Sequence, residues 1–370
     1  MSHPSRALRI LHSEAATGWG GQEQYIHRMM LAMRQRGHYL EAVCQPHAKL
    51  VERLREEGFT VHTMPMDGPA NYFRGLGRIR KILKQGQFDV LNCHSRRDTM
   101  LAGVAARLAG TPLIVRTRHL AKPPGSLISY TGVPHRVTTA SEFVRQMLVK
   151  RGVPEGHVAV VYPAVELPPQ TGHSTLRSEL KLAANDIVVG CVAVMRAPKG
   201  HKELVDAMVP LISERPNLHL VLVGGGSPVF EEIQAYVQER GISRRVHMLG
   251  MRNDVPNLLE GFDIFALATR QEASGTVFVE AGAMGVPVVG TRVDGVPEMM
   301  KEGVNGFLVP LDDVPALTGA IRRLVEDESL RKRMGEAGLE FCRHSGHFGL
   351  QAMVQRVESA YLRWLGELKK

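Results

Sequence analysis

The sequence predicts two α/β domains, each built on a doubly wound and mostly parallel sheet. The chain has 370 residues, more than the ~250–300 at which a single hydrophobic core stops growing. Short apolar runs typical of strands alternate with helical patterns over most of its length. Residues 163–174 interrupt this alternation with three prolines and no periodicity, which indicates a linker. We expect one domain over residues 1–168 and a second over residues 169–348, followed by a C-terminal helix over residues 349–370.

The strand-like runs of the first domain are short and rich in valine, leucine and isoleucine, as in a sheet covered by helices on both faces. They lie at residues 8–11, 40–44, 61–64, 90–93, 113–115, 137–139 and 158–162. Between them, the spacing of apolar residues predicts helices at residues 25–35, 72–84, 99–109 and 142–150.

The second domain repeats this order. Strands are predicted at residues 187–194, 218–223, 246–249, 264–267 and 286–289. Helices are predicted at residues 202–214, 229–240 and 277–284, and the pattern after Val309 is helical to the end of the chain. Ligands of such sheets bind in the loops that follow the carboxyl ends of the strands.

The composition is that of a soluble globular protein, with 44% hydrophobic and 22% charged residues. No run approaches the ~18 apolar residues that span a bilayer, and residues 1–21 lack the apolar stretch of a signal peptide. Four widely spaced cysteines lie in or beside apolar runs, which predicts reduced thiols in the core. They are Cys44, Cys93, Cys191 and Cys342. We therefore expect a cytoplasmic protein.

The net charge of +9 is unevenly distributed. Residues 1–170 hold 23 Lys and Arg against 12 Asp and Glu, whereas residues 171–370 hold 23 against 25. A basic half favours a polyanionic partner, which could be nucleic acid, an anionic membrane surface or a phosphorylated substrate. Residues 72–84 of this half are predicted to form a basic amphipathic helix. Such a helix fits a membrane surface or, alternatively, buries its apolar stripe in the domain core.

A glycine-rich loop at residues 18–23 (GWGGQE) follows the first strand and precedes a helix. Glycines at this place let the backbone approach a phosphate near a helix N-terminus. The loop does not match a nicotinamide dinucleotide fingerprint. Glu23 occupies the place of the third glycine, and the second strand ends without a carboxylate that could hold a ribose.

Two loops of the second domain combine charge with a helix start. Arg196 and Lys199 follow a strand, and two cations beside a helix N-terminus suit a diphosphate. Glu272 lies in the loop after residues 264–267, and Glu280 lies in the following helix, where a carboxylate suits ribose hydroxyls. In the first domain, His119 ends a strand at the edge where ligands bind.

The sequence disfavours metal-dependent phosphoryl chemistry. It contains no Asp-x-Asp motif, no Gly-x-x-x-x-Gly-Lys-Ser/Thr loop, and no His, Cys and carboxylate cluster with the spacing of metal ligands. We therefore expect no metal site.

Together, these features resemble the retaining glycosyltransferase family 4, and the resemblance covers nearly the whole chain. Its most specific part is Glu272 and Glu280 followed by residues 285–289 (GVPVV) and 295–298 (GVPE). The resemblance implies the GT-B fold, which has two facing Rossmann-like domains. The first would bind the acceptor and the second the donor, and the C-terminal helix would cross back to the first.

The resemblance also implies roles for individual residues. His119 and Glu272 would contact the donor sugar. Arg196 and Lys199 would hold its diphosphate, and these two pairs are the expected catalytic residues. The other residues expected around the donor are Gly20, Gly21, Met251, Arg252, Ser274, Gly275, Thr276 and Glu280.

The implied reaction moves a sugar from a nucleotide diphosphate sugar to a glycan or lipid-linked acceptor, with retention at the anomeric carbon and without a metal cofactor. A UDP-sugar is the expected donor, and lipopolysaccharide or another cell-envelope polysaccharide is the expected product. The basic first half favours an anionic acceptor met at the inner face of a bacterial cytoplasmic membrane.

Two other interpretations remain open. A nucleotide-sugar epimerase shares the two-domain architecture and would need no acceptor. A nucleic-acid-binding protein would explain the basic half. However, aromatic residues make up only 5% of the chain, and no zinc-finger, helix-turn-helix or aromatic-rich RNA-binding signature occurs. We therefore expect no nucleic-acid partner.

Overall fold

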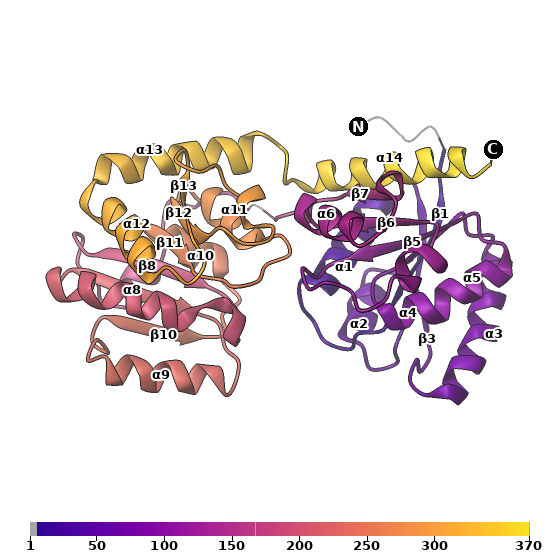
Figure 1. Ribbon diagram of the computed structural model, residues 1–370, viewed down its shortest axis with the longest axis horizontal. Coiled ribbons are helices and arrows are strands. Elements are labelled where there is room, and N and C mark those ends of the chain that lie inside the picture. The colour runs from indigo at the N-terminus through magenta and orange to yellow at the C-terminus, as the bar shows by residue number, and fades with distance from the viewer. Residues whose placement is uncertain (1–5, 167, 370) are drawn as a thin grey trace. The chain divides into compact units, whose positions relative to one another are not determined.

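The computed structural model describes residues 6–166 and 168–369 and divides into two compact units. The first unit contains Met1–Ala164 and Leu350–Lys370, and the second contains Val165–Gly349. The C-terminal helix therefore belongs to the first unit, although it follows the second in sequence (Figure 1).

The first unit is built on one parallel sheet. Within residues 6–166, its seven strands lie in the order β3-β2-β1-β4-β5-β6-β7. Their bounds are β1 Arg9–Glu14, β2 Tyr39–Cys44, β3 Thr60–Thr63, β4 Val90–Cys93, β5 Leu113–Arg118, β6 Arg136–Thr139 and β7 Val158–Val160. Each predicted strand of this unit is present. However, β1 and β5 extend past their predicted ends into buried polar residues.

Helices connect these strands. They are α1 Gly21–Gln35, α2 Lys49–Glu56, α3 Pro69–Gly86, α4 Arg96–Asp98, α5 Val104–Ala109 and α6 Glu142–Lys150. The helix predicted at residues 99–109 begins with a π-helical turn, Thr99–Gly103, which α5 continues. The start of α6 is capped by Ser141, whose Oγ accepts a hydrogen bond from the Val144 N–H at 3.3 Å.

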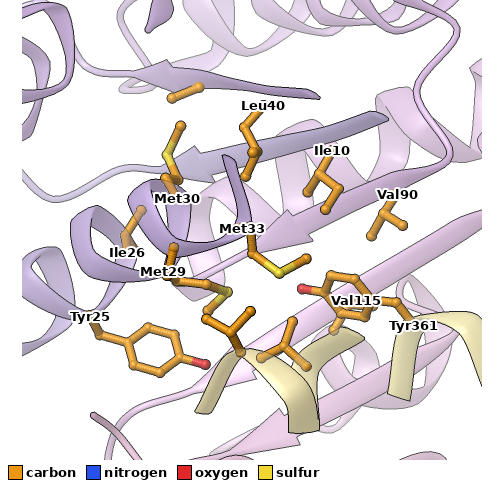
Figure 2. Packing of buried hydrophobic residues seen from close by; sticks show 14 of the residues in the cluster. Ile10, Tyr25, Ile26, Met29, Met30, Met33, Leu40, Val90, Val115 and Tyr361 are labelled. Atoms are coloured by element: carbon orange, nitrogen blue, oxygen red, sulfur yellow. The ribbon is translucent and has the colours of Figure 1, made fainter. Parts of the chain in front are cut away.

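The C-terminal helix α14 (Leu350–Glu367) packs on the first unit beside α1. Tyr361 and Trp364 of α14 are fully buried in one hydrophobic cluster with Met29 and Met33 of α1. Figure 2 shows Tyr361 among the methionines of α1 and the strand residue Val115. Burying a large side chain of this kind contributes roughly 1.5–3 kcal/mol, so the cluster holds α14 firmly on this unit.

A buried ion pair adds a polar contact to the same helix. Glu358 of α14 accepts hydrogen bonds from the Arg36 guanidinium, whose Nε lies 3.1 Å from Oε2. The other carboxylate oxygen lies 3.1 Å from His38 Nε2. Because all three side chains are buried, removing Arg36 or Glu358 would leave the other charge unpaired in the core.

The second unit is built on a second parallel sheet. Within residues 168–349, six strands lie in the order β10-β9-β8-β11-β12-β13. Their bounds are β8 Ile187–Val192, β9 Leu218–Val223, β10 Val246–Gly250, β11 Ile264–Leu267, β12 Val288–Thr291 and β13 Gly306–Val309. The helices are α7 Leu176–Glu179, α8 His201–Glu214, α9 Val229–Glu239, α10 Val255–Glu260, α11 Thr276–Gly282, α12 Val314–Glu326 and α13 Glu328–Leu339. The elements α7, α10 and β13 were not predicted from the sequence.

Both sheets confirm the predicted doubly wound α/β class, since each alternates parallel strands with helices. Every strand pair among the described residues is parallel. The carboxyl ends of neighbouring strands therefore meet along one edge of each sheet. Those edges carry the candidate residues.

The apolar stripe of α3 faces the core of the first unit. Ile79 and Leu83 are buried, and Tyr72, Leu76 and Ile82 pack against the same cluster. The alternative in which this helix buries its apolar stripe in the domain core is therefore confirmed. The basic residues on the other faces of the helix are exposed, and they are Arg74, Arg78, Arg80, Lys81 and Lys84. Phe73, which flanks the stripe, is 72% exposed.

Two further expectations concern the chain as a whole. Cys44, Cys93, Cys191 and Cys342 are buried free thiols, as predicted. Within the described residues, no helix has the length and apolar character needed to span a bilayer.

Candidate functional site

The loop between β8 and α8 carries the two cations predicted to bind a diphosphate. Arg196 is exposed, and Lys199 ends the short 3-10 turn Ala197–Lys199. Gly200 follows with φ +67, and a Cβ at this position would lie 1.8 Å from the carbonyl oxygen of Ala268. Only glycine fits, because both the backbone conformation and the close approach exclude a side chain.

Contacts with the end of β11 hold this loop in place. The carbonyl oxygen of Pro198 accepts hydrogen bonds from the Arg270 N–H at 2.7 Å and from Thr269 Oγ1 at 3.1 Å. The Arg270 side chain pairs with Glu203 of α8 and with Asp312. The sequence analysis did not single out Arg270, although a cation directly after a predicted strand is a signal that could have found it.

Lys199 and Glu272 form an ion pair between Nζ and Oε2. Both side chains are about one-fifth exposed, at 25% and 18%, so solvent screens the pair only partly. The sequence predicted both residues for the site but did not predict this contact.

The backbone of Glu272 is also fixed. Its N–H donates to Asp294 Oδ2 at 3.0 Å, and its carbonyl oxygen accepts from the Gly295 N–H at 3.0 Å. Burial raises the pKa of Asp294, as does the nearby Glu272 carboxylate, whereas the Glu272 N–H lowers it. Asp294 thus orients the loop that carries Glu272, and spacing in the sequence alone could not assign it this role.

The N-terminus of α11 lies beside this pair. Gly275 caps the helix with φ +72, and a Cβ there would lie 3.2 Å from Cγ of Glu272. Ser274 is buried, whereas Thr276 and Glu280 are half-buried. The first N–H groups of a helix lack partners within the helix and attract negative charge. The structure therefore brings Lys199, Glu272 and the start of α11 together.

A pocket opens on the same unit beside this loop. It is lined by Arg196, Ala197, His201, Lys202, Glu203, Val229, Glu232, Ile233 and Arg270. His201 begins α8 and is 3% exposed, and neither of its ring nitrogens has a hydrogen-bond partner among the described residues. Burial, together with the Lys199 charge, lowers the pKa of His201 to about 4 and so keeps the ring neutral at pH 7.

Met251 and Arg252, predicted to border the base, differ in their surroundings. Met251 is 72% exposed, and a Cβ on Gly225 of the neighbouring loop would lie 3.0 Å from its Cγ. The Arg252 guanidinium is engaged by two carboxylates, with NH1 2.6 Å from Glu179 and Nε 2.8 Å from Asp254. Contact of these two residues with a base stays a prediction.

The remaining candidates lie on the first unit. Gly20 is the N-cap of α1, and its N–H donates to Glu23 Oε2 at 2.7 Å. Glu23 therefore caps the helix, which accounts for a carboxylate in this loop. Gly21 is exposed, and no heavy atom lies within 4 Å of where its Cβ would be. The loop is open to solvent there.

His119 follows β5 and is half-buried. Its Nε2 lies 3.1 Å from Nδ1 of His94, and its ring packs edge-on against Tyr25 with the centroids 5.0 Å apart. Burial lowers the pKa of His119 to about 3, with further lowering by the Arg116 and Arg118 charges. His119 is therefore neutral at pH 7, and its ring can donate or accept a hydrogen bond but carries no charge.

Two arginines lie on β5 next to His119. Arg116 stacks over the Tyr130 ring at 4.2 Å, and Arg118 Nε donates to the Leu120 carbonyl oxygen at 3.0 Å. They give this edge of the first unit a positive charge. The described ranges hold no group of three or more His, Cys, Asp or Glu side chains placed to bind a metal ion.

Two family models match the chain, one on each unit. Residues 19–167 match Glycosyltransferase Family 4, and residues 173–341 match Glycosyl transferases group 1. Both glutamates and both cations of the second-unit site fall in the group 1 match, whereas His119 falls in the family 4 match.

Among characterised relatives, the chain is 32% identical over 189 residues to the lipopolysaccharide core biosynthesis glycosyltransferase LpsE of Rhizobium meliloti (strain 1021), covering 51% of this chain and 52% of that protein. It is 25% identical over 276 residues to the UDP-Gal:alpha-D-GlcNAc-diphosphoundecaprenol alpha-1,3-galactosyltransferase of Escherichia coli, covering 70% and 71%. The match thus covers about half the length of LpsE (52%) and 71% of the length of the galactosyltransferase.

The fold is also that of a solved structure. Anabaena Alr3699/HepE in complex with UDP superposes with a TM-score of 0.86 at 20% identity, covering 96% of this chain and all of that one. At this identity the likeness establishes the fold alone.

Proposed function

Because the chain belongs to the glycosyltransferases, with a family 4 first domain and a group 1 second domain, we propose that it transfers a sugar from a nucleotide diphosphate sugar to an acceptor hydroxyl, with retention at the anomeric carbon. The observation that carries this proposal is the cluster of Lys199, Glu272 and the N-terminus of α11 on the second unit.

In the proposed reaction, the bond between the anomeric carbon and the diphosphate oxygen breaks. The acceptor oxygen forms its new bond on the same face of the sugar, and the acceptor proton passes to the leaving phosphate oxygen. The leaving group gains negative charge as its bond breaks. Lys199, Arg196 and the free N–H groups at the start of α11 would stabilise that charge electrostatically.

Glu272 and Glu280 would have different partners in this reaction. Glu272 forms an ion pair with Lys199 and is proposed to accept hydrogen bonds from the donor sugar. Glu280, one helical turn inside α11, is proposed to bind the ribose hydroxyls. His119, neutral and at the carboxyl edge of the first sheet, is proposed to hydrogen-bond the reacting sugar.

A thermal-shift panel with UDP-, GDP- and ADP-sugars tests the donor class. The UDP ligand of the Anabaena structure makes a UDP-sugar the first candidate. Ligand at 100 times its dissociation constant should stabilise the protein by ~2.7 kcal/mol, and Glu280→Ala should lose most of that shift. If none of the three classes shifts the melting temperature of the wild type, the proposed donor is wrong.

We expect EDTA to leave the transferase activity intact, because the proposed charge stabilisation uses Arg196, Lys199 and a helix N-terminus rather than a metal. The measurement is the rate of nucleotide diphosphate release with and without excess chelator. Activity that is lost in EDTA and restored by Mg²⁺ or Mn²⁺ would contradict metal independence.

The proposed acceptor is an anionic glycan or lipid-linked glycan of the cell envelope, met at a membrane surface. Relatives named for lipopolysaccharide core and diphosphoundecaprenol substrates support this class. The exposed basic faces of α3 and the exposed Phe73 ring supply charge and an apolar contact on one element. A Lys or Arg near an anionic surface contributes about 1 kcal/mol each.

Changing Arg74, Arg78, Lys81 and Lys84 to serine should therefore weaken binding to anionic vesicles by about 4 kcal/mol at low salt, or roughly a thousandfold, while donor affinity is unchanged. The matched control changes four exposed basic residues of the second unit, namely Arg244, Lys301, Lys332 and Arg333. Vesicle co-sedimentation measures both sets. If the two sets weaken binding equally, or if wild type ignores anionic vesicles, α3 is a solvated helix.

A further inference from the structure

Three histidine rings form a line through the first unit. His12 lies on β1, His94 directly follows β4, and His119 directly follows β5. Nδ1 of His12 lies 3.0 Å from Nε2 of His94, and Nδ1 of His94 lies 3.1 Å from Nε2 of His119. The ring planes are nearly parallel and the rings lie edge to edge, with centroids 5.3 and 5.4 Å apart and interplanar angles of 15° and 23°.

The backbone of the middle histidine is fixed as well. The backbone N–H of His94 donates to Asp98 Oδ2 at 2.8 Å, and Ser13 Oγ donates to the same oxygen at 2.8 Å. This anchors β4 to β1 next to the rings. His12 and His94 are 1% and 3% exposed, so neither exchanges its ring partners for water.

The rings are neutral at pH 7. Burial lowers the pKa of His12 to about 3, and burial and the two flanking rings lower that of His94. The other groups near His119 are Tyr25, Arg116 and Arg118. None of these is an anion that would favour a charged ring.

Counting protons then leaves two arrangements. Each nitrogen–nitrogen contact needs one proton, and neutral His94 carries only one, so it donates in one contact and accepts in the other. If His94 donates to His119, all three rings carry their proton on Nδ1. If His94 accepts from His119, all three carry it on Nε2. Mixed tautomers would leave one contact with two protons or with none.

We propose that His12 and His94 are positioning residues that couple the three rings, so that all three adopt the same tautomer. The tautomer they share fixes whether the outer nitrogen of His119, Nδ1, donates or accepts a hydrogen bond. The inner end of the line has no partner with which to exchange a proton. His12 Nε2 is buried and has no hydrogen-bond partner in the described part of the chain. The tautomer of His119 can therefore change only together with those of His94 and His12.

The role of this tautomer in the reaction rests on the proposed function, in which His119 hydrogen-bonds the reacting sugar. The coupling between the three rings does not depend on that function. Because a sugar hydroxyl can donate or accept, the tautomer of His119 decides which of the two that hydroxyl does, and so where its proton lies. His12 and His94 should thus affect turnover more than donor binding, which is proposed for the other unit.

The test is ¹⁵N NMR of the histidine-labelled full chain at pH 7.5, where side-chain shifts distinguish the two neutral tautomers. We expect one common tautomer for His12, His94 and His119. His94→Phe keeps an aromatic ring but removes both hydrogen bonds, and should move the His119 shifts towards averaged values. His12→Phe, two rings away, should also move them.

The control is His247→Phe. His247 makes a similar contact on the second unit, 3.0 Å from His219, and its replacement should leave the His119 shifts unchanged. Different tautomers among the three wild-type rings, or His119 shifts that ignore both variants, would overturn the coupling. With a nucleotide sugar donor, His12→Phe should lower kcat about tenfold at constant donor KM. An unchanged kcat would overturn the positioning role, whereas an absence of transfer by wild type would count against the proposed function alone.

Discussion

Replacing Lys199 with alanine is expected to weaken binding of a UDP-sugar by ~1.5–3 kcal/mol, or about 10- to 150-fold. Two effects add. The diphosphate loses a cation, and Glu272 loses the ion-pair partner that neutralises it. An unpaired carboxylate beside the diphosphate then repels it. Isothermal titration calorimetry with the wild type and the variant measures the loss.

The double variant Lys199→Ala/Glu272→Gln separates these effects. Because it removes the unpaired carboxylate as well, it should bind the UDP-sugar more tightly than Lys199→Ala alone. Residues in contact are expected to be non-additive in this way. Lys301→Ala, which removes an exposed lysine of the same unit, is the control and should leave the affinity unchanged. Additive losses, or an equal loss in the control, would refute the proposed role of the pair.

Glu272→Gln alone should lower kcat by about 10- to 100-fold, because the carboxylate is proposed to accept hydrogen bonds from the donor sugar as it reacts. Affinity for UDP itself should stay equal or increase, since the substitution frees Lys199 to bind the diphosphate. Steady-state kinetics and UDP titration give the two quantities. Full turnover, or weaker UDP binding, would remove Glu272 from the proposed catalytic residues.

The regular elements were predictable where apolar residues run without interruption. The strand β9 and the helix α6 have the predicted bounds, because each is a continuous apolar or amphipathic pattern. The strand β13 was missed, because it has four residues and begins at Gly306, which together with Asn305 signals a turn. The strand β1 was predicted too short, because its second half includes His12, Ser13 and Glu14.

Those polar residues explain why the site was harder to predict than the fold. The carboxyl ends of the strands carry buried polar side chains whose partners come from distant parts of the sequence. Two sets of contacts depend on the order of the strands in each sheet, namely Lys199 with Glu272, and His94 with His12 and His119. The spacing of residues along one segment of the chain does not show that order. The residues of the second-unit cluster were predictable one by one, whereas their pairing was not.

Hydrogen exchange measured by mass spectrometry, with and without a saturating UDP-sugar, tests the central claim most directly, because it needs no acceptor. The amides of residues 196–203 and 272–280 should be protected together, since the diphosphate is proposed to lie on the β8–α8 loop and on the start of α11. Glu280→Ala should reduce this protection at the same ligand concentration. Protection confined to the first unit, or unchanged exchange in both segments at saturation, would contradict a donor site built from Lys199, Glu272 and α11.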